Sequence, residues 1–219
     1  MTEEKIQKIR LNIGNEEIKK NLETYKKMTI DLGASDAKII KTSQVSADER
    51  VTLKCEIPKC YHYGNCAHCP PHTMTAERTR KVLSLYENAI VFKTEVPPDV
   101  IVITENDRDL SIKWVMAYRK ITEICNKVES AAFYKGDYLA LGFAAGSCHS
   151  NYCNPAEKCA VLGGKPCIHY YRTRPSMESV GIDCFKLATE LGWEIIPIGS
   201  GAKANHISHG TLMGLVLIN

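Results

Sequence analysis

The sequence predicts an α/β protein in which helices cover a mixed β-sheet. Short apolar runs of strand length alternate with longer segments whose apolar residues recur every three or four positions, as on one face of a helix. Two cysteine-rich stretches each follow an expected strand directly, and loops at strand ends commonly carry function. The 219 residues suffice for one full hydrophobic core, so we expect a single globular domain over residues 1–219.

The N-terminal elements follow from apolar spacing and from residues that end helices or strands. Four apolar residues recur at helical spacing and predict the first helix: Ile18, Leu22, Tyr25 and Leu32. Gly33 can end this helix, because glycine adopts the left-handed backbone conformation at little cost. The segments expected next are a strand at 37–41, a turn at 42–50, a short extended run at 51–54 that leads into a metal-binding loop at 55–74, a helix at 75–88 and a strand at 89–96.

The C-terminal elements begin with a long helix expected at 107–132. Five of its residues form one apolar stripe: Trp114, Tyr118, Ile121, Cys125 and Val128. The segments expected next are a strand at 138–144, a second metal-binding loop at 148–175, a helical region at 176–192 and strands at 193–198 and 211–218. Ser176 and Asp183 can cap helices in this region, and Gly192 can end the last of them.

Composition and charge argue against several classes of protein. The formal net charge is only +3 and the basic residues are dispersed, which does not favour nucleic acid or membrane binding. Residues 1–21 are charged throughout and lack the apolar centre of a secretory signal. The longest apolar run, 212–218, is far shorter than the roughly 20 residues that a membrane-spanning helix needs. We therefore expect a cytoplasmic protein, whose ten cysteines serve metal ligation rather than disulfides.

Eight of the ten cysteines fall into two groups of four. The first group contains Cys55, Cys60, Cys66 and Cys69, and the second contains Cys148, Cys153, Cys159 and Cys167. Four thiolates suit one metal ion or iron–sulfur cluster, because anionic sulfurs offset the positive charge of the metal. Binding can also order a loop that lacks a hydrophobic core of its own. We therefore predict that all eight cysteines are metal and cofactor ligands.

The cysteine spacing favours iron–sulfur clusters over zinc. Zinc sites usually join two tight Cys-x2–4-Cys pairs, and the second group has only one such pair. A four-iron cluster is larger than a zinc ion, so wider spacings suit it, and Pro70 directly after Cys69 is typical of bacterial ferredoxins. We expect two [4Fe-4S] clusters, with zinc as the alternative. Neither group has the Cys-x3-Cys-x2-Cys spacing of radical enzymes that cleave S-adenosylmethionine.

Two motifs around the cysteine groups carry a family resemblance. The first joins Tyr63 and Gly64 to the run Cys69, Pro70 and Pro71. The second comprises GKPC at 164–167, RPSME at 174–178 and GID at 181–183. Together they resemble the cysteine-rich family of predicted metal-binding proteins (domain of unknown function 2284). The resemblance implies metal binding, in anaerobes, with no established reaction.

Position 66 departs from the pattern of that family. The pattern has cysteines at the positions of Cys55, Cys60 and Cys69, so the resemblance implies three thiolate ligands in the first loop. One iron would then be left for a histidine, water or a small molecule. The local chemistry favours ligation by Cys66, because Cys66-x2-Cys69 is compact and a free thiol beside a cluster would compete for iron.

The remaining candidate residues have plainer explanations. Cys125 and Cys184 lie on apolar helix faces, where cysteine packs as a small hydrophobe. Five histidines near the groups could ligate metal, but are more simply polar loop residues: His62, His68, His72, His149 and His169. The glycine loop 199–201 is more simply flexible than a phosphate cradle. Arg172 and Arg174 could balance cluster charge, bind an anionic partner or substrate, or form surface ion pairs.

Three functions remain open. The first is low-potential electron transfer to a redox partner protein or cofactor enzyme, which includes reductive activation of that partner. The second is an iron–sulfur enzyme in which one iron of the first cluster lacks a protein thiolate. The third is a zinc-stabilised binding protein, although the absence of a basic recognition face does not favour nucleic acid. No residue is assigned a catalytic role, and nothing indicates an oligomeric state.

Overall fold

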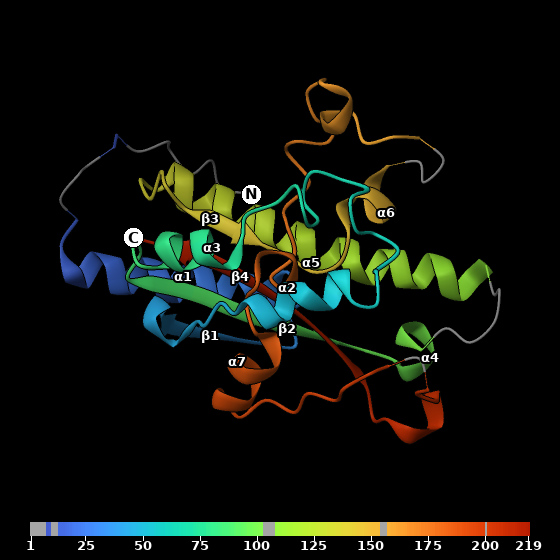
Figure 1. Cartoon of the computed structure of the whole chain (residues 1–219). Helices are drawn as coiled ribbons and strands as arrows, with labels where there is room; N and C mark the ends of the chain where they lie inside the picture. Colours follow the sequence, from blue (N-terminus) through green and yellow to red (C-terminus); the bar gives the residue numbers. More distant parts are fainter. Residues whose placement is uncertain (1–7, 10–12, 103–107, 154–156, 200) are drawn as a thin grey trace.

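The computed structural model describes residues 8–9, 13–102, 108–153, 157–199 and 201–219. Its centre is a four-stranded sheet with the spatial order β1-β2-β4-β3 (Figure 1). The strands are β1 (Asp36–Lys41), β2 (Asn88–Val96), β3 (Leu141–Phe143) and β4 (Gly210–Ile218). Because helices pack on both faces of this sheet, the predicted α/β class is confirmed.

All three strand pairs are antiparallel, which corrects the expectation of a mixed sheet. The only parallel pairing within the described residues is the isolated bridge between Ala144 and Ser176. The central neighbours β2 and β4 are separated in the chain by a long helix and the second cysteine loop. An alternation of strands and helices does not specify which strands become neighbours, so it could not determine their relative direction.

The two central strands are buried on both faces. In β2, Ala89 and Val91 face one hydrophobic core, while Ile90 and Phe92 face the other. Successive side chains of a strand point to opposite faces, so one uninterrupted apolar run supplies both cores. Gly214 lies opposite Phe92 in the β2–β4 ladder, and any side chain at 214 would collide with the aromatic ring. The close approach of the ring therefore requires glycine at this position.

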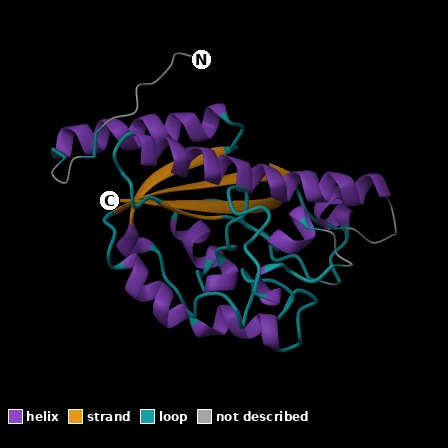
Figure 2. Cartoon of the chain, turned by 90° about the horizontal axis from the view of Figure 1, so that it is seen from above, coloured by secondary structure: helices purple, strands orange, loops and turns teal. Residues whose placement is uncertain are grey.

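Two long helices, α1 (Asn15–Asp31) and α5 (Arg108–Tyr134), cover one face of the sheet (Figure 2). Leu22 and Tyr25 of α1 are buried there, as the helical spacing predicts. The helix ends before Gly33, which has the expected positive φ of 98°. Residue 107, the expected start of α5, and residue 200 of the glycine loop lie outside the described residues.

Shorter helices cover the opposite face, among them α3 (Ala76–Leu83) and α7 (Cys184–Glu190). Thr75 Oγ1 and Asp183 Oδ1 each accept a backbone N–H from three residues further on, at 3.2 and 2.9 Å. These caps satisfy N–H groups that the first turn of a helix leaves unpaired, and the prediction that Asp183 is a cap is confirmed. The helix after Thr75 is shorter than the predicted 75–88.

Two expected strands differ from the structure. The segment 193–198 forms no strand, because a side chain rather than a backbone ladder holds it beside β1. Trp193 Nε1 donates to Asp36 Oδ2 at 2.6 Å. The strand expected at 138–144 is reduced to β3, which pairs with only three residues of β4.

Short helical elements form most of the remaining connections. They are η1 (Thr42–Gln44), α2 (Glu49–Glu56), α4 (Pro98–Ile101), α6 (Cys148–Tyr152), η2 (Val161–Gly163), η3 (Glu178–Val180) and η4 (Ala204–His206). Cys55 belongs to α2, so the first cysteine lies in a helix and not in the irregular loop that was expected. In the part of the chain that the structure describes, no helix is long and apolar enough to cross a membrane.

Candidate metal centre

The two cysteine loops are far apart in the chain but lie side by side in the structure (Figure 1). Cys66 and Cys69 of the first loop form a small buried cluster with Cys159 of the second loop. The half-buried Cys148 packs against this cluster. These cysteines belong to neither of the two hydrophobic cores that cover the sheet. The fold thus brings thiols of both groups into one packing unit outside the main cores.

Tight turns shape the first loop. The N–H of Cys60 donates to the carbonyl of Cys55, at the end of α2, at 2.8 Å. Gly64 has a positive φ of 76°, which glycine tolerates, and its N–H donates to the carbonyl of Pro70 at 2.8 Å. The first bond closes a turn between Cys55 and Cys60, and the second folds the segment after Gly64 back toward Pro70, next to Cys69.

Three thiols at the junction of the loops share hydrogen bonds. Interaction with the side chains of Cys148 and Cys69 lowers the pKa of Cys66, and the same interaction raises the pKa of Cys148 and of Cys69. The sulfurs of Cys66 and Cys69 are each 3.8 Å from the hydroxyl oxygen of Ser147. The arrangement favours a thiolate at Cys66, and the thiolate is the form of cysteine that ligates metal.

The second loop holds its three later cysteines near one another. Cys153 directly follows α6, which begins at Cys148. Burial raises the pKa of the Cys153 thiol, and the nearby Cys159 and Cys167 raise it further by charge repulsion. The sulfur of Cys167 accepts the backbone N–H of His169 at 3.4 Å, a bond that also stabilises a metal-bound thiolate.

The eight cysteines predicted as ligands are all free thiols, and they lie in the two loops or, as Cys55 in α2 and Cys148 in α6, in the short helices that lead into them. Free, partly buried thiols, one of which has a lowered pKa, are a donor set that suits an iron–sulfur cluster or zinc. Within the described residues, however, no three His, Cys, Asp or Glu side chains are arranged so that they could hold a single metal ion.

Cys125 and Cys184 are buried in the hydrophobic cores, as predicted. Cys125 lies between α5 and the sheet, and its thiol donates to the carbonyl of Phe143 at 3.5 Å. Cys184 opens α7 in the core on the other face. Desolvation raises the pKa of both thiols, so both stay protonated. The apolar periodicity therefore separated these packing cysteines correctly from those of the loops.

Two of the loop histidines have polar partners of their own. His62 Nδ1 is 3.2 Å from the hydroxyl of Ser150, and His149 Nε2 is 2.9 Å from the carbonyl of Glu157. His68 differs, because its Nδ1 is buried without a hydrogen-bond partner. Burial also lowers the pKa of His68, which keeps the ring neutral and able to ligate metal. His68 is thus the histidine best placed to contact a bound cluster.

Arg174 forms an ion pair in the interior rather than at the surface. Its Nη2 and Nε lie 2.6 and 2.8 Å from the two carboxylate oxygens of Glu129 in α5. Only 19% and 16% of the two side chains are exposed. This bidentate pair fastens the end of the second loop to the helix. Arg172, by contrast, is exposed.

A cavity of about 420 Å³ adjoins the first cysteine loop. Cys55, Cys60 and Cys69 line it, whereas Cys66 does not. Several of its polar lining residues were not predicted from the sequence as site residues: Tyr118, Ser147, Glu178 and Thr211. The RPSME motif contains Glu178 and was the one available signal, but only the fold shows that this residue lines a cavity.

A helix-covered sheet that carries two converging cysteine loops has the character of a metal-binding protein. The chain belongs to the family described as predicted metal-binding protein (domain of unknown function 2284), whose model matches residues 38–218. The match includes both cysteine loops and all four strands but for the first two residues of β1, and it confirms the resemblance. No curated protein and no solved structure matches the chain.

Proposed function

We propose that this is an iron–sulfur protein that holds two [4Fe-4S] clusters and transfers electrons at low potential, or reductively activates a partner. Cys55, Cys60, Cys66 and Cys69 would hold one cluster, and Cys148, Cys153, Cys159 and Cys167 the other. The observation that carries the proposal is the contact of Cys66 and Cys69 with Cys148. Clusters on loops that touch would be close enough to exchange electrons, and the bound clusters would supply the redox chemistry.

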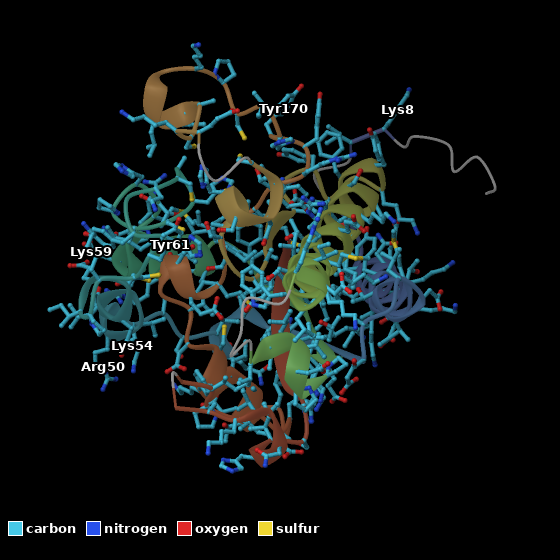
Figure 3. The ribbon with its side chains drawn as sticks, turned by 90° about the vertical axis from the view of Figure 1, so that its right-hand side faces the viewer. Lys8, Arg50, Lys54, Lys59, Tyr61 and Tyr170 are labelled. Atoms are coloured by element: carbon cyan, nitrogen blue, oxygen red, sulfur yellow. The ribbon has the colours of Figure 1, made fainter. Side chains whose placement is uncertain are left out.

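The surface near the first loop suits transient docking of a redox partner protein. Two large apolar side chains are exposed there, Ile57 at 71% and Tyr61 at 77%. Lys54 and Lys59 are exposed around them, together with Glu56, and Arg50 is paired with Asp48 (Figure 3). Exposed apolar groups among charges of both signs are typical of a surface that a partner covers only transiently.

Metal analysis of anaerobically purified protein tests this proposal. We expect about eight iron and eight sulfide per chain, because each group supplies one four-iron cluster. The control is Cys125→Ser, which should retain the full iron content because Cys125 is buried in the core away from the loops. Stoichiometric zinc with little iron would reject the iron–sulfur proposal and support a zinc-stabilised binding protein.

One observation favours a second candidate, an enzyme whose first cluster has an iron open to substrate. The cavity is lined by Cys55, Cys60 and Cys69, the three positions of the family pattern, and Cys66 faces the second loop instead. Three thiolates at a cavity wall would hold a cluster and leave one coordination position facing the cavity. Cys66 would then serve the second group, whose Cys153 its charge already affects.

The Cys66→Ala variant distinguishes the two candidates. Its electron paramagnetic resonance spectrum and iron content would be compared with those of Cys60→Ala, which damages the first cluster, and Cys153→Ala, which damages the second. Because the lead proposal makes Cys66 a ligand of the first cluster, we expect the Cys66→Ala spectrum to match that of Cys60→Ala. A match to Cys153→Ala would instead indicate that Cys66 serves the second group, and would favour the open-site enzyme over electron transfer alone.

A further inference from the structure

The cavity beside the first cysteine loop has the volume and the mixture of apolar and polar lining residues expected of a small-molecule site. Its volume of about 420 Å³ lies within the range of ordinary ligand pockets. One part of the wall is aliphatic and includes Ile195, Ile196 and Ile198 from the irregular segment before β4. Another part carries thiols and polar groups, among them Glu178. The lining is therefore amphipathic.

The charged side chains that line the cavity are negative and not positive. Glu178 is the only carboxylate among the described residues that line the cavity, and no lysine or arginine lines it. Glu178 is also close to the first cysteine loop, because its charge adds to the desolvation that raises the pKa of Cys55. A positively charged ligand would therefore meet an attractive field next to the proposed cluster site.

Glu178 has no cationic partner of its own. Among the described residues no lysine, arginine or histidine forms an ion pair with it, and the polar side chains that influence its carboxyl group are the neutral Cys184 and Ser176. Glu178 is an exposed residue that lines the cavity, and partial desolvation by its neighbours raises the pKa of its carboxyl group. Its carboxylate is therefore available to pair with a cation that enters the cavity.

We propose that this cavity binds a small organic ammonium compound, with the ammonium group on Glu178 and the apolar part against the isoleucine wall. As a statement about substrate class, the inference rests on the second candidate function, the open-site enzyme. The ligand would lie between Glu178 and Cys55, with its head group next to the first cysteine loop. Binding of the ligand itself needs only the cavity, so it can be tested apart from catalysis.

Calorimetric titration of the anaerobically purified protein tests the inference. The probe is n-hexylamine, which is an ammonium ion at neutral pH, and the matched neutral probe is 1-hexanol. We expect hexylammonium to bind at least about tenfold more tightly, because a charged hydrogen bond to the carboxylate in the cavity wall is stronger than a neutral one. In Glu178→Gln this preference should disappear. The control Glu190→Gln removes a similar charge from the exposed end of α7 and should keep it.

A second variant keeps the test decisive if Glu178→Gln does not fold. Ile196→Trp places a large side chain in the aliphatic wall and should abolish binding of both probes while the iron content stays that of the wild type. Equal binding of the two probes to the wild-type protein, or an unchanged preference in Glu178→Gln, would overturn the inference. Iron analysis of the same samples separates this failure from failure of the iron–sulfur proposal, which would appear as missing iron with ammonium binding intact.

Discussion

The sheet with its helices and the pair of cysteine loops are organised by different interactions. In the sheet region, β2 and β4 are buried on both faces, and large side chains such as Phe92 and Ile121 are fully enclosed. In the loop region regular structure is short, and cysteines such as Cys60 and Cys153 are only half-buried. The sheet region is stable through apolar burial, whereas the loops carry donor atoms whose best use is to bind something.

Removal of the bound metal should produce the largest difference between the two regions. We expect a chelator to abolish hydrogen-exchange protection in residues 55–74 and 148–175, because ligation orders loops that lack a core. Amides of β2 and β4 should remain protected, since their ladder and both cores are independent of the loops. Exchange followed by mass spectrometry measures both regions at once. Loss of protection throughout would show that the metal stabilises the whole fold.

Phe92→Ala should destabilise the sheet region and leave metal binding by the loops intact. The ring is fully buried against Gly214 and the helices, so its removal should lower the free energy of unfolding by about 3–5 kcal/mol. Denaturant unfolding followed by circular dichroism measures this loss. Iron content should stay normal in the fraction that remains folded. Selective loss of iron from folded protein would contradict the independence of the two regions.

Arg174→Met tests the ion pair that links the second cysteine loop to helix α5 of the sheet region. Removing the arginine leaves the carboxylate of Glu129 unpaired between α5 and the second loop, which should cost about 3 kcal/mol. The matched control is Arg50→Met, since Arg50 is paired with Asp48 but 86% exposed, and it should leave the stability nearly unchanged. Equal effects of the two variants would mean that the Arg174 pair is no more than a surface contact.

Of metal removal and the three substitutions Phe92→Ala, Arg174→Met and Cys125→Ser, the last should have the smallest effect on stability. A buried hydroxyl in place of the thiol should lower stability by about 1–2 kcal/mol, even though the carbonyl of Phe143 offers it an acceptor. Iron content should be unchanged, whereas Cys60→Ser should lose a cluster. Loss of iron from Cys125→Ser would place this cysteine among the ligands.

Much of the sheet region was predictable because its signals are local. Helical spacing located α1, apolar runs located β2 and β4, and Asp183 was recognised as a cap. The segment 193–198 was not predictable, because its apolar residues suit a strand equally well. Its path depends on the contact of Trp193 with Asp36, and no local pattern encodes a partner so far away in the chain.

In the candidate site, too, some features follow from local sequence and others only from the tertiary structure. The sequence by itself determined which cysteines gather in loops and which pack in cores, because clustering with turn residues and helical periodicity are both local properties. Only the tertiary structure placed Cys66 against Cys148 and brought Glu178 to the same cavity as Cys55. These neighbours come from separate segments that the antiparallel pairing of β2 and β4 helps to bring together. Such contacts depend on how the chain closes over long separations, and spacing along the sequence carries no measure of that.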